Sequence, residues 1–251
     1  MDVVFPVKNS NWSSPIVPVA KPDGSIRICG DYSGTVNLNL KVEIYPQPRR
    51  EELFSKLAGG NRFSKIDLSN AYLQMELDDD SKEMLTINTS KGLFRYNRLP
   101  FGIASAPAIF QRAIEQIMQG FKMVLVYQDD ILITAKNDKD HLRTLDEVLS
   151  RLKAYGLRVK PNKVTFFAES LNYLGYKIDA HGVHVINDKV EAILHVPAPT
   201  NVSQLRSFLG TVNYYSSFIQ NISQGCHTSP KKNPAKIWLF WHEIPAILHP
   251  K

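Results

Sequence analysis

The stretch KMVLVYQDDILITA, residues 122–135, decides the fold of this chain, because two apolar runs flank a polar trio within it. Two runs of strand length, joined by residues that favour turns, predict a tight β-hairpin with Asp129 and Asp130 at its tip. A second apolar run, FSKIDL at 63–68, predicts a short strand that carries Asp67. The chain therefore places carboxylates next to strands that are otherwise apolar.

Helices and further hairpins surround this central stretch. Apolar side chains repeat at helical spacing in three segments, 105–119, 138–155 and 202–219. Alternating runs joined by turn residues predict three more hairpins, at 16–29, 85–99 and 173–185. Pro197, Pro199 and Thr200 predict a linker, and no structure is predicted for 224–251. Strands and helices interleave without a Gly-rich phosphate loop, which predicts the α+β class.

Composition sets the limits of the problem. A chain of 251 residues holds one large domain or two small ones, and 43% hydrophobic with 22% charged residues excludes wholesale disorder. Cys29 and Cys226 are too few for a disulfide scaffold or a zinc ribbon. The sequence has neither a signal-peptide core nor 18 consecutive apolar residues, so we expect a cytoplasmic or nuclear protein without a membrane partner.

The net charge of +6 is unevenly distributed. Both flanks of the chain are basic, whereas the section 67–130 is acidic. This pattern suggests a polyanionic partner bound outside and cations bound inside. Swings of this kind also occur by chance in soluble proteins, so the pattern alone decides nothing.

The three carboxylates need an explanation. Moving an unpaired carboxylate out of water costs several kcal/mol, and neighbouring carboxylates also repel each other. A divalent cation removes both penalties, since Mg²⁺ prefers one or two carboxylates together with phosphate oxygens and water. For the Asp-Asp dipeptide alone, ordinary turn chemistry in an exposed hairpin is the simpler explanation.

Several motifs together resemble one family. The segments FSKIDLSNAYLQ (63–74), RYNRLPFGIASAPAIFQR (95–112) and YQDD (127–130) resemble three successive motifs of reverse transcriptases. The likeness is to the gypsy type found in long-terminal-repeat retrotransposons and retroviruses, within a Pol polyprotein. KPDGSIRICGDY (21–32) resembles the fingers hairpin of these enzymes, and YLGY (173–176) resembles their primer grip. The order and separations agree over roughly residues 5–223.

The resemblance implies a right-hand polymerase architecture. Fingers and palm would occupy 1–185, with an antiparallel palm sheet packed on helices, and a partial thumb or connection would begin in 186–223. Fingers would take about 1–42 and 75–104, and the palm about 43–74 and 105–185. Residues 224–251 would form a divergent tail.

The resemblance also implies a metal site. Asp67 and Asp129 would be the principal ligands, completed by Asp130 and the carbonyl of Leu68. Two Mg²⁺ ions, with Mn²⁺ as a substitute, would activate a primer 3′-hydroxyl and stabilise the leaving pyrophosphate. A strand carboxylate would then have to meet a hairpin-tip carboxylate across the sheet.

The resemblance also implies a nucleotide site, whose residues are spread along the chain from Lys21 to Lys163. Tyr72 would be the aromatic gate under the incoming sugar, where its ring would clash with a 2′-hydroxyl. Lys163 would protonate the departing pyrophosphate, although Lys160 is close enough to take that role. The remaining nucleotide-binding residues would be Lys21, Arg27, Phe101, Gly102 and Gln128, and the primer grip would be Leu174 and Gly175.

The sequence departs from the family pattern in three places. Gln128 takes a position that is usually aliphatic, so nucleotide selection or fidelity is expected to differ. Residues that normally precede the fingers hairpin are expected to be absent. After Ser223 the sequence leaves the expected path toward a connection and a ribonuclease H region, which we also expect to be absent.

Two functions of different class remain open. The first is an RNA-directed DNA polymerase fragment that uses dNTPs and an RNA or DNA template with a primer. The second is a catalytically weak or inactive nucleic-acid-binding protein derived from a retroelement. A metal nuclease is disfavoured, because hydrolysis needs neither Tyr72 nor the fingers hairpin. Protein partners are not indicated by the sequence.

Overall fold

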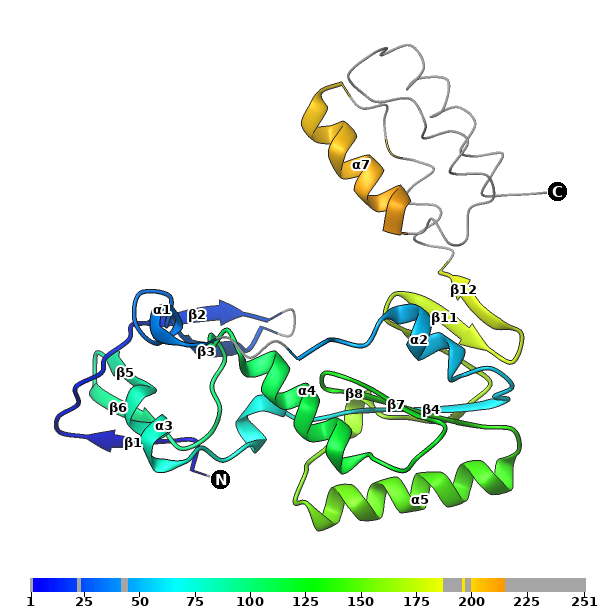
Figure 1. Ribbon diagram of the computed structural model, residues 1–251, viewed down its shortest axis with the longest axis horizontal. Coiled ribbons are helices and arrows are strands. Elements are labelled where there is room, and N and C mark those ends of the chain that lie inside the picture. Colours follow the sequence, from blue (N-terminus) through cyan, green and yellow to red (C-terminus); the bar gives the residue numbers. More distant parts are fainter. Residues whose placement is uncertain (1, 22–23, 42–44, 187–195, 197–199, 215–251) are drawn as a thin grey trace. The chain divides into compact units, whose positions relative to one another are not determined.

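The centre of the fold is a four-stranded antiparallel sheet with the order β7-β8-β4-β9 in a computed structural model. The structure describes residues 2–21, 24–41, 45–186, 196 and 200–214. The chain divides into two compact units, Met1–Glu169 and Ser170–Lys251, and each is described by itself. In the first unit, β4 (Arg62–Asp67) lies between β8 (Asp130–Ala135) and β9 (Thr165–Ala168), and β7 (Val124–Tyr127) forms the edge (Figure 1).

Two amphipathic helices cover this sheet. In α4 (Ala106–Ile117) and α5 (Asp138–Ala154), the buried side chains repeat at helical spacing, and they pack against β7, β8 and β4. A proline lies in the first turn of α4, and the Asn137 side chain caps α5 by accepting from the Asp140 N–H. Ile66, Ile131 and Ile133 are fully buried between the sheet and these helices. The predicted hairpin at 122–135 and both helices are therefore present.

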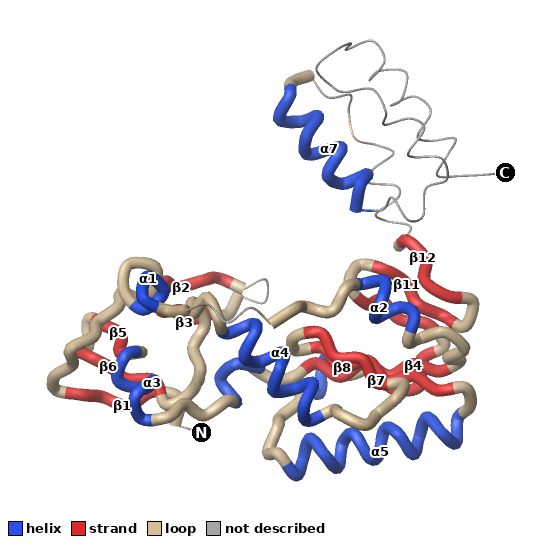
Figure 2. Tube along the Cα trace, in the orientation of Figure 1, coloured by secondary structure: helices blue, strands red, loops and turns tan. Residues whose placement is uncertain are grey.

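The first unit also contains two smaller sheets. The three-stranded sheet has the order β1-β6-β5, formed by β1 (Val4–Val7), β5 (Thr86–Thr89) and β6 (Gly92–Tyr96). Helix α3 (Asp79–Met84) lies beside it (Figure 2). The hairpin of β2 (Ile16–Ala20) and β3 (Ile26–Gly30) forms the other sheet, and its turn includes residues 22–23, outside the described residues. Both hairpins agree with the sequence prediction.

Short elements complete the first unit. They are α1 (Val36–Asn39), α2 (Arg50–Ser55) and the single turns of 3-10 helix at Ala71–Gln74 and Pro161–Lys163. The sequence analysis missed these elements, and it also missed β1, α3 and β9. Each is only one or two turns of helix or four residues of strand, too short for a periodic pattern to stand out.

The second unit contains a three-stranded antiparallel sheet and one described helix. The strands are β10 (Ser170–Tyr173), β11 (Tyr176–Asp179) and β12 (Gly182–Val185), and the helix is α7 (Val202–Tyr214). The predicted hairpin at 173–185 is thus the second of two consecutive hairpins. The predicted linker prolines and the tail 224–251 lie outside the described residues.

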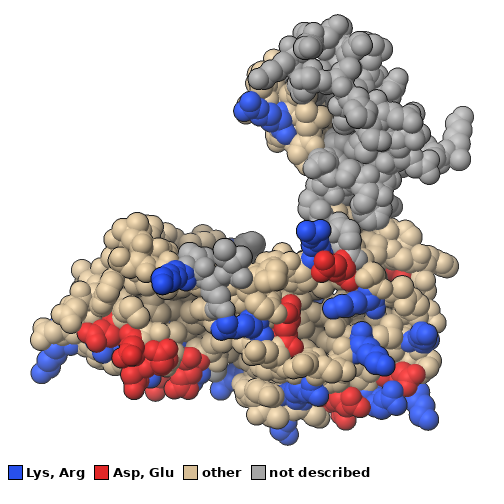
Figure 3. Space-filling model, viewed as in Figure 1, with Lys and Arg blue, Asp and Glu red and all other residues tan. Residues whose placement is uncertain are grey.

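The acidic section of the sequence has a plain structural explanation. Figure 3 shows acidic side chains gathered on the surface over α3. Most carboxylates of the section 67–130 are found there, in or beside that helix: Glu76, Asp78, Asp79, Asp80 and Glu83. Asp78 caps the helix by accepting from the Ser81 N–H, and Asp79 and Asp80 lie in its first turn, where the helix dipole favours negative charge. The negative charge of the section 67–130 therefore comes mainly from one helix and its flanking residues.

One buried histidine makes stability depend on pH. His141 on α5 is fully buried, and its Nε2 lies 2.7 Å from the Ser64 hydroxyl of β4. Burial lowers the pKa of His141, and the charge of Asp138 only partly opposes this. The folded pKa lies below the value of 6.5 for an exposed imidazole, so the unfolded chain takes up more protons.

We therefore expect stability to fall as the pH drops below about 6.5. The measurement is the midpoint of thermal unfolding between pH 7.5 and 5 for the wild type and for His141→Leu. The variant starts less stable, because the Ser64 hydroxyl loses its bond to His141 and keeps only the one from the Phe167 N–H, but it should show a shallower loss with acid. Parallel pH curves for the two proteins would assign the acid sensitivity to other groups.

Candidate functional site

The register of the central sheet brings the three carboxylates together. In the antiparallel pair β4–β8, Asp67 lies directly opposite Asp130. The backbone N–H of Leu68 donates to the carbonyl of Asp129 at 2.8 Å, which ties the end of β4 to the β7–β8 turn. Directly opposed residues in an antiparallel pair have Cβ atoms about 5 Å apart. Residues distant in the sequence thus meet at one end of the sheet, as the sequence analysis required.

Lysines neutralise these carboxylates. The ammonium of Lys160 lies 2.8 Å from Oδ1 of Asp67, and that of Lys163 lies 3.8 Å from Oδ2. Lys65, two residues before Asp67 on β4, lies 2.9 Å from Asp130. Burial raises the pKa of Asp130, and the hydrogen bond with Lys65 opposes this effect. The cluster of carboxylates and ammonium groups is therefore close to charge balance.

The backbone holds Lys160 in this position. Its N–H donates to the carbonyl of Asp67 at 2.9 Å, and Val159 forms a β-bridge with Leu68. The segment that carries Lys160 and Lys163 is thus fastened to the end of β4. The ion pair with Asp67 follows from this backbone pairing.

The donor set suits a divalent cation of the Mg²⁺ type. Among the described residues, no three acidic, His or Cys side chains are grouped around one point as coordinating ligands. Mg²⁺ does not require such a group, because it usually binds one or two carboxylates and completes its shell with phosphate oxygens and water. Oδ1 of Asp67 is buried and, within the described chain, has no hydrogen-bond partner besides the ion pair with Lys160. A buried carboxylate oxygen of this kind is a suitable ligand.

A cavity of about 820 Å³ opens beside the carboxylates. Its lining combines basic, aromatic and acidic residues. They come from the β2–β3 hairpin, the segment after β4, the loop before α4 with the first turn of α4, the β7–β8 turn with the end of β7, and the segment after α5. These residues are Lys21, Arg27, Asn70, Ala71, Tyr72, Phe101, Pro107, Tyr127, Gln128, Asp129, Lys160 and Lys163. Seven of the residues singled out from the sequence thus line the same cavity: Lys21, Arg27, Tyr72, Phe101, Gln128, Asp129 and Lys163.

Aromatic contacts fix the shape of the cavity. The ring of Tyr72 lies 5.1 Å from that of Phe101 and 5.5 Å from that of Phe110, between ring centroids. The Arg27 guanidinium lies 4.3 Å over the Phe101 ring, a cation–π contact that holds the β2–β3 hairpin toward the loop before α4. Burial, and then the negative charge of Asp129, raises the pKa of Tyr72. Its hydroxyl therefore stays protonated near neutral pH.

The other singled-out residues do not line this cavity. Asp67, Leu68 and Asp130 lie at the end of the central sheet next to Asp129, and none of them lines the cavity. Leu174 and Gly175 belong to the second unit, where both adopt a positive φ in the turn between β10 and β11.

Gly102 has a packing role that the sequence analysis did not foresee. It was expected to line the nucleotide pocket, but it does not contribute to the cavity lining. Its φ is +107°, and a Cβ atom there would lie 2.1 Å from the carbonyl oxygen of Gly30 at the end of β3. Close contact between two backbones therefore seats the β2–β3 hairpin against the loop that presents Phe101.

We expect Gly102→Ala to lower the free energy of unfolding by about 2–4 kcal/mol, from backbone strain and overpacking together. Urea unfolding measures this loss. Gly92→Ala is a matched control, because Gly92 has a φ of +105° with nothing within 4 Å of the added Cβ. Equal losses in the two variants would show that the contact with Gly30 is unimportant.

The sequence analysis also missed residues at the site. Asn70, which precedes the short helix Ala71–Gln74 with a φ of +48°, and Pro107 of α4 both line the cavity. Asn tolerates the left-handed region better than most residues, which was the available signal for a turn at position 70. Lys160 was considered only as an alternative to Lys163, yet it makes the closer ion pair with Asp67.

Comparison with known proteins assigns the family. The sequence profile of the family described as reverse transcriptase (RNA-dependent DNA polymerase) matches residues 19–178. The chain belongs to the reverse transcriptase family. The matched residues run from the β2–β3 hairpin to β11 and include the carboxylates and the cavity. The family expected from the sequence motifs is thereby confirmed.

Individual relatives give the same result for this reverse transcriptase chain. The C. elegans protein named "Uncharacterized protein K02A2.6" is 40% identical over 226 residues, which cover 89% of this chain and 18% of that protein. The transposon Tf2-3 polyprotein of Schizosaccharomyces pombe is 34% identical over 92% of this chain and 17% of the polyprotein. The chain thus spans less than a fifth of the length of these relatives.

Solved structures confirm the fold. A foamy viral protease–reverse transcriptase in complex with double-stranded DNA matches with a TM-score of 0.87 and 24% identity, over 98% of this chain and 45% of that one. A second foamy viral structure matches with a TM-score of 0.86. The expected α+β architecture of reverse transcriptase fingers and palm is therefore correct. In the described part of the chain, no helix has the length and apolar character needed to cross a bilayer.

Proposed function

We propose that this chain is an RNA-directed DNA polymerase, the reverse transcriptase part of a retrotransposon polyprotein. It adds dNTPs to the 3′-hydroxyl of a primer paired with an RNA or DNA template. The observation that carries the proposal is the meeting of Asp67 with Asp129 and Asp130 beside a cavity lined with basic and aromatic groups. The carboxylates suit the catalytic cations, and the cavity suits a nucleoside triphosphate.

The carboxylates would hold the divalent cations. Asp67, Asp129 and Asp130, with the Leu68 carbonyl, are the proposed ligands for two Mg²⁺ ions or for Mn²⁺ in their place. When bound, such ions lower the pKa of the primer hydroxyl and neutralise charge on the triphosphate. Lys160 pairs with Asp67, and this contact would be exchanged when the site is loaded.

Other side chains would bind and orient the nucleotide. Lys21 and Arg27 enter the cavity from the β2–β3 hairpin, where an ammonium and a guanidinium suit phosphate oxygens. Tyr72 and Phe101 present rings at a distance of 5.1 Å, which suit the sugar of the incoming nucleotide. Lys163, exposed at the cavity wall, is the proposed proton donor to pyrophosphate.

Two solved structures support the proposed template and primer. Foamy viral reverse transcriptases have been solved with double-stranded DNA and with an RNA/DNA hybrid. This supports a template–primer duplex as the partner of the present chain. Leu174 and Gly175 are the proposed primer grip, since both adopt a positive φ in the turn between β10 and β11 and a glycine without a side chain allows a phosphate to approach the backbone closely.

A primer-extension assay tests the proposal. A labelled DNA primer on an RNA template, with dNTPs and Mg²⁺ or Mn²⁺, should be extended, and a chelator should stop the reaction. Duplex binding without extension under either cation would favour the second candidate, a catalytically inactive nucleic-acid-binding protein. The observation that favours this second candidate is that Lys160 already pairs with Asp67 and Lys65 with Asp130.

A further inference from the structure

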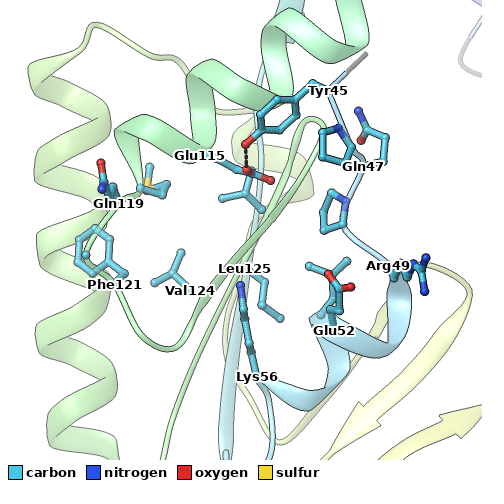
Figure 4. Close-up of a pocket in the computed structure, with 16 residues that line it drawn as sticks. Tyr45, Gln47, Arg49, Glu52, Lys56, Glu115, Gln119, Phe121, Val124 and Leu125 are labelled. Atoms are coloured by element: carbon cyan, nitrogen blue, oxygen red, sulfur yellow. Dashed lines mark hydrogen bonds between the residues drawn. The ribbon is translucent and has the colours of Figure 1, made fainter.

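Gln128, at the tip of the β7–β8 hairpin, is the meeting point of two chains of hydrogen bonds. Its side-chain Oε1 accepts from the hydroxyl of Tyr72 at 3.0 Å. Its Nε2 donates to Oε1 of Gln47 at 2.9 Å. Gln47 does not line the 820 Å³ cavity; it lines a second cavity of about 490 Å³, shown in Figure 4. The first chain thus links the Tyr72 hydroxyl to a residue outside the proposed nucleotide site.

The second chain starts from the backbone of the same residue. The Gln128 N–H donates to Oε1 of Gln111 at 2.7 Å, and Nε2 of Gln111 donates to Glu115 at 2.6 Å. The other oxygen of Glu115 accepts from the hydroxyl of Tyr45, drawn as the dashed line in Figure 4. Both chains therefore end on one short segment, residues 45–47, which precedes α2.

This arrangement holds Gln128 in a conformation that it would not otherwise favour. Its φ is +54°, in the left-handed region where a residue with a side chain is strained. Gln111 is fully buried on α4, and it also donates to the Val126 carbonyl at 3.0 Å, so its position is fixed. The backbone and the side chain of Gln128 are consequently both held, and its Oε1 is available to Tyr72.

The Tyr72 ring is therefore fixed at both ends. Its ring edge packs among Phe101 and Phe110, and its hydroxyl is anchored through Gln128. A ring fixed in this way rejects an added sugar hydroxyl more strongly than a ring free to tilt. A ring that is free to tilt can move away from the 2′-hydroxyl at a small cost in free energy, and the clash with the ribonucleotide is then relieved.

We infer that Gln128 and Gln47 are positioning residues for Tyr72 and thereby set how strongly the site rejects ribonucleotides. The inference rests on the proposed function, because it needs nucleotide incorporation to be measured. Neither glutamine needs to contact the 2′-hydroxyl, and Gln47 lies outside the nucleotide cavity. An effect of Gln47 on the choice between ribose and deoxyribose would thus have to pass through the hydrogen bonds that connect Gln47 to Gln128 and Gln128 to Tyr72.

The decisive variant is Gln47→Met, which keeps the length of the side chain and removes its amide group. We measure kcat/KM for one dNTP and for the matching rNTP in single-nucleotide extension. Loss of one hydrogen bond in the chain should raise the ratio of rNTP to dNTP incorporation about fivefold. The value for the dNTP should stay within about twofold, since the ring still supports the deoxyribose. Gln119→Met is the matched control, because Gln119 also lines the 490 Å³ cavity but its side chain takes part in neither chain of hydrogen bonds.

A double-mutant cycle identifies the route. Gln128→Met should relax sugar choice at least as much as Gln47→Met, and in a Tyr72→Phe background neither change should have a further effect. Equal loss of dNTP and rNTP incorporation, or an unchanged ratio in Gln47→Met, would overturn the inference. The same gain in ratio with and without the Tyr72 hydroxyl would overturn it too. Absence of extension by the wild type would instead refute the proposed function, so the two failures are distinguishable.

Discussion

Asp129→Asn should abolish primer extension, with a loss of about 10³-fold or more, while the chain stays folded. Asp129 is exposed at the second position of the β7–β8 turn, where its carboxylate lines the cavity. The amide keeps the shape of the side chain but removes the charge that suits a divalent cation. It also removes repulsion from Asp130, whose pKa is raised in part by the charge of Asp129.

Extension rate and thermal midpoint should be measured together for Asp129→Asn. Asp146→Asn is the matched control. Asp146 is exposed on α5, and its substitution makes the same chemical change away from the site. The expected result is a folded, inactive Asp129 variant beside an active control. A midpoint that falls by many degrees would mean that Asp129 is needed for structure, and full activity would remove it from the ligand set.

Tyr72→Ala should relax the rejection of ribonucleotides by roughly 100-fold, because the ring that would clash with a 2′-hydroxyl is gone. Tyr72 is held between Phe101 and Phe110, so its ring has a defined position beside the cavity. The same truncation leaves a space next to these rings, and some loss of stability is expected. Incorporation of dNTPs should therefore fall while incorporation of rNTPs rises relative to it.

The ratio of kcat/KM values for rNTP and dNTP checks this result. Tyr155→Ala serves as a control for loss of a tyrosine, since Tyr155 is 63% exposed at the end of α5. Binding of the two nucleotides to a duplex with a chain-terminated primer gives a second readout that does not depend on the chemical step. A ratio unchanged in Tyr72→Ala would remove the gate assignment and, with it, the role inferred for Gln128.

The elements with strong local signals were predictable from the sequence. Helices α4 and α5 have apolar stripes of three to five turns, and the hairpin of β7 and β8 has apolar runs on both sides of a polar turn. The meeting of Asp67 with Asp130 could be expected only through the family resemblance. Strand pairing between distant segments has no local signature, because register depends on the whole packed sheet.

The contacts that the sequence did not predict are those between distant segments. Gln47 and Gln128 are 81 residues apart, and nothing local to either residue predicts that their side chains meet. Lys160 pairs with Asp67 because a β-bridge between Leu68 and Val159 brings it there. The acidic section has a local explanation, since five of its carboxylates lie in or beside α3, and Asp78, Asp79 and Asp80 occupy the N-cap and the first turn.

The pairing of β4 with β8 has a consequence for how activity can be lost. Ile66 lies opposite Ile131, and both side chains are fully buried on the face that α4 and α5 cover. Sliding either strand by a single position would move these isoleucines off the face that the helices cover and turn Asp67 toward the helices. The packing of these isoleucines thus selects one strand register, and that register places Asp67 opposite Asp130. A sheet with another register loses this packing, so misaligned carboxylates are expected to go together with a loss of the fold.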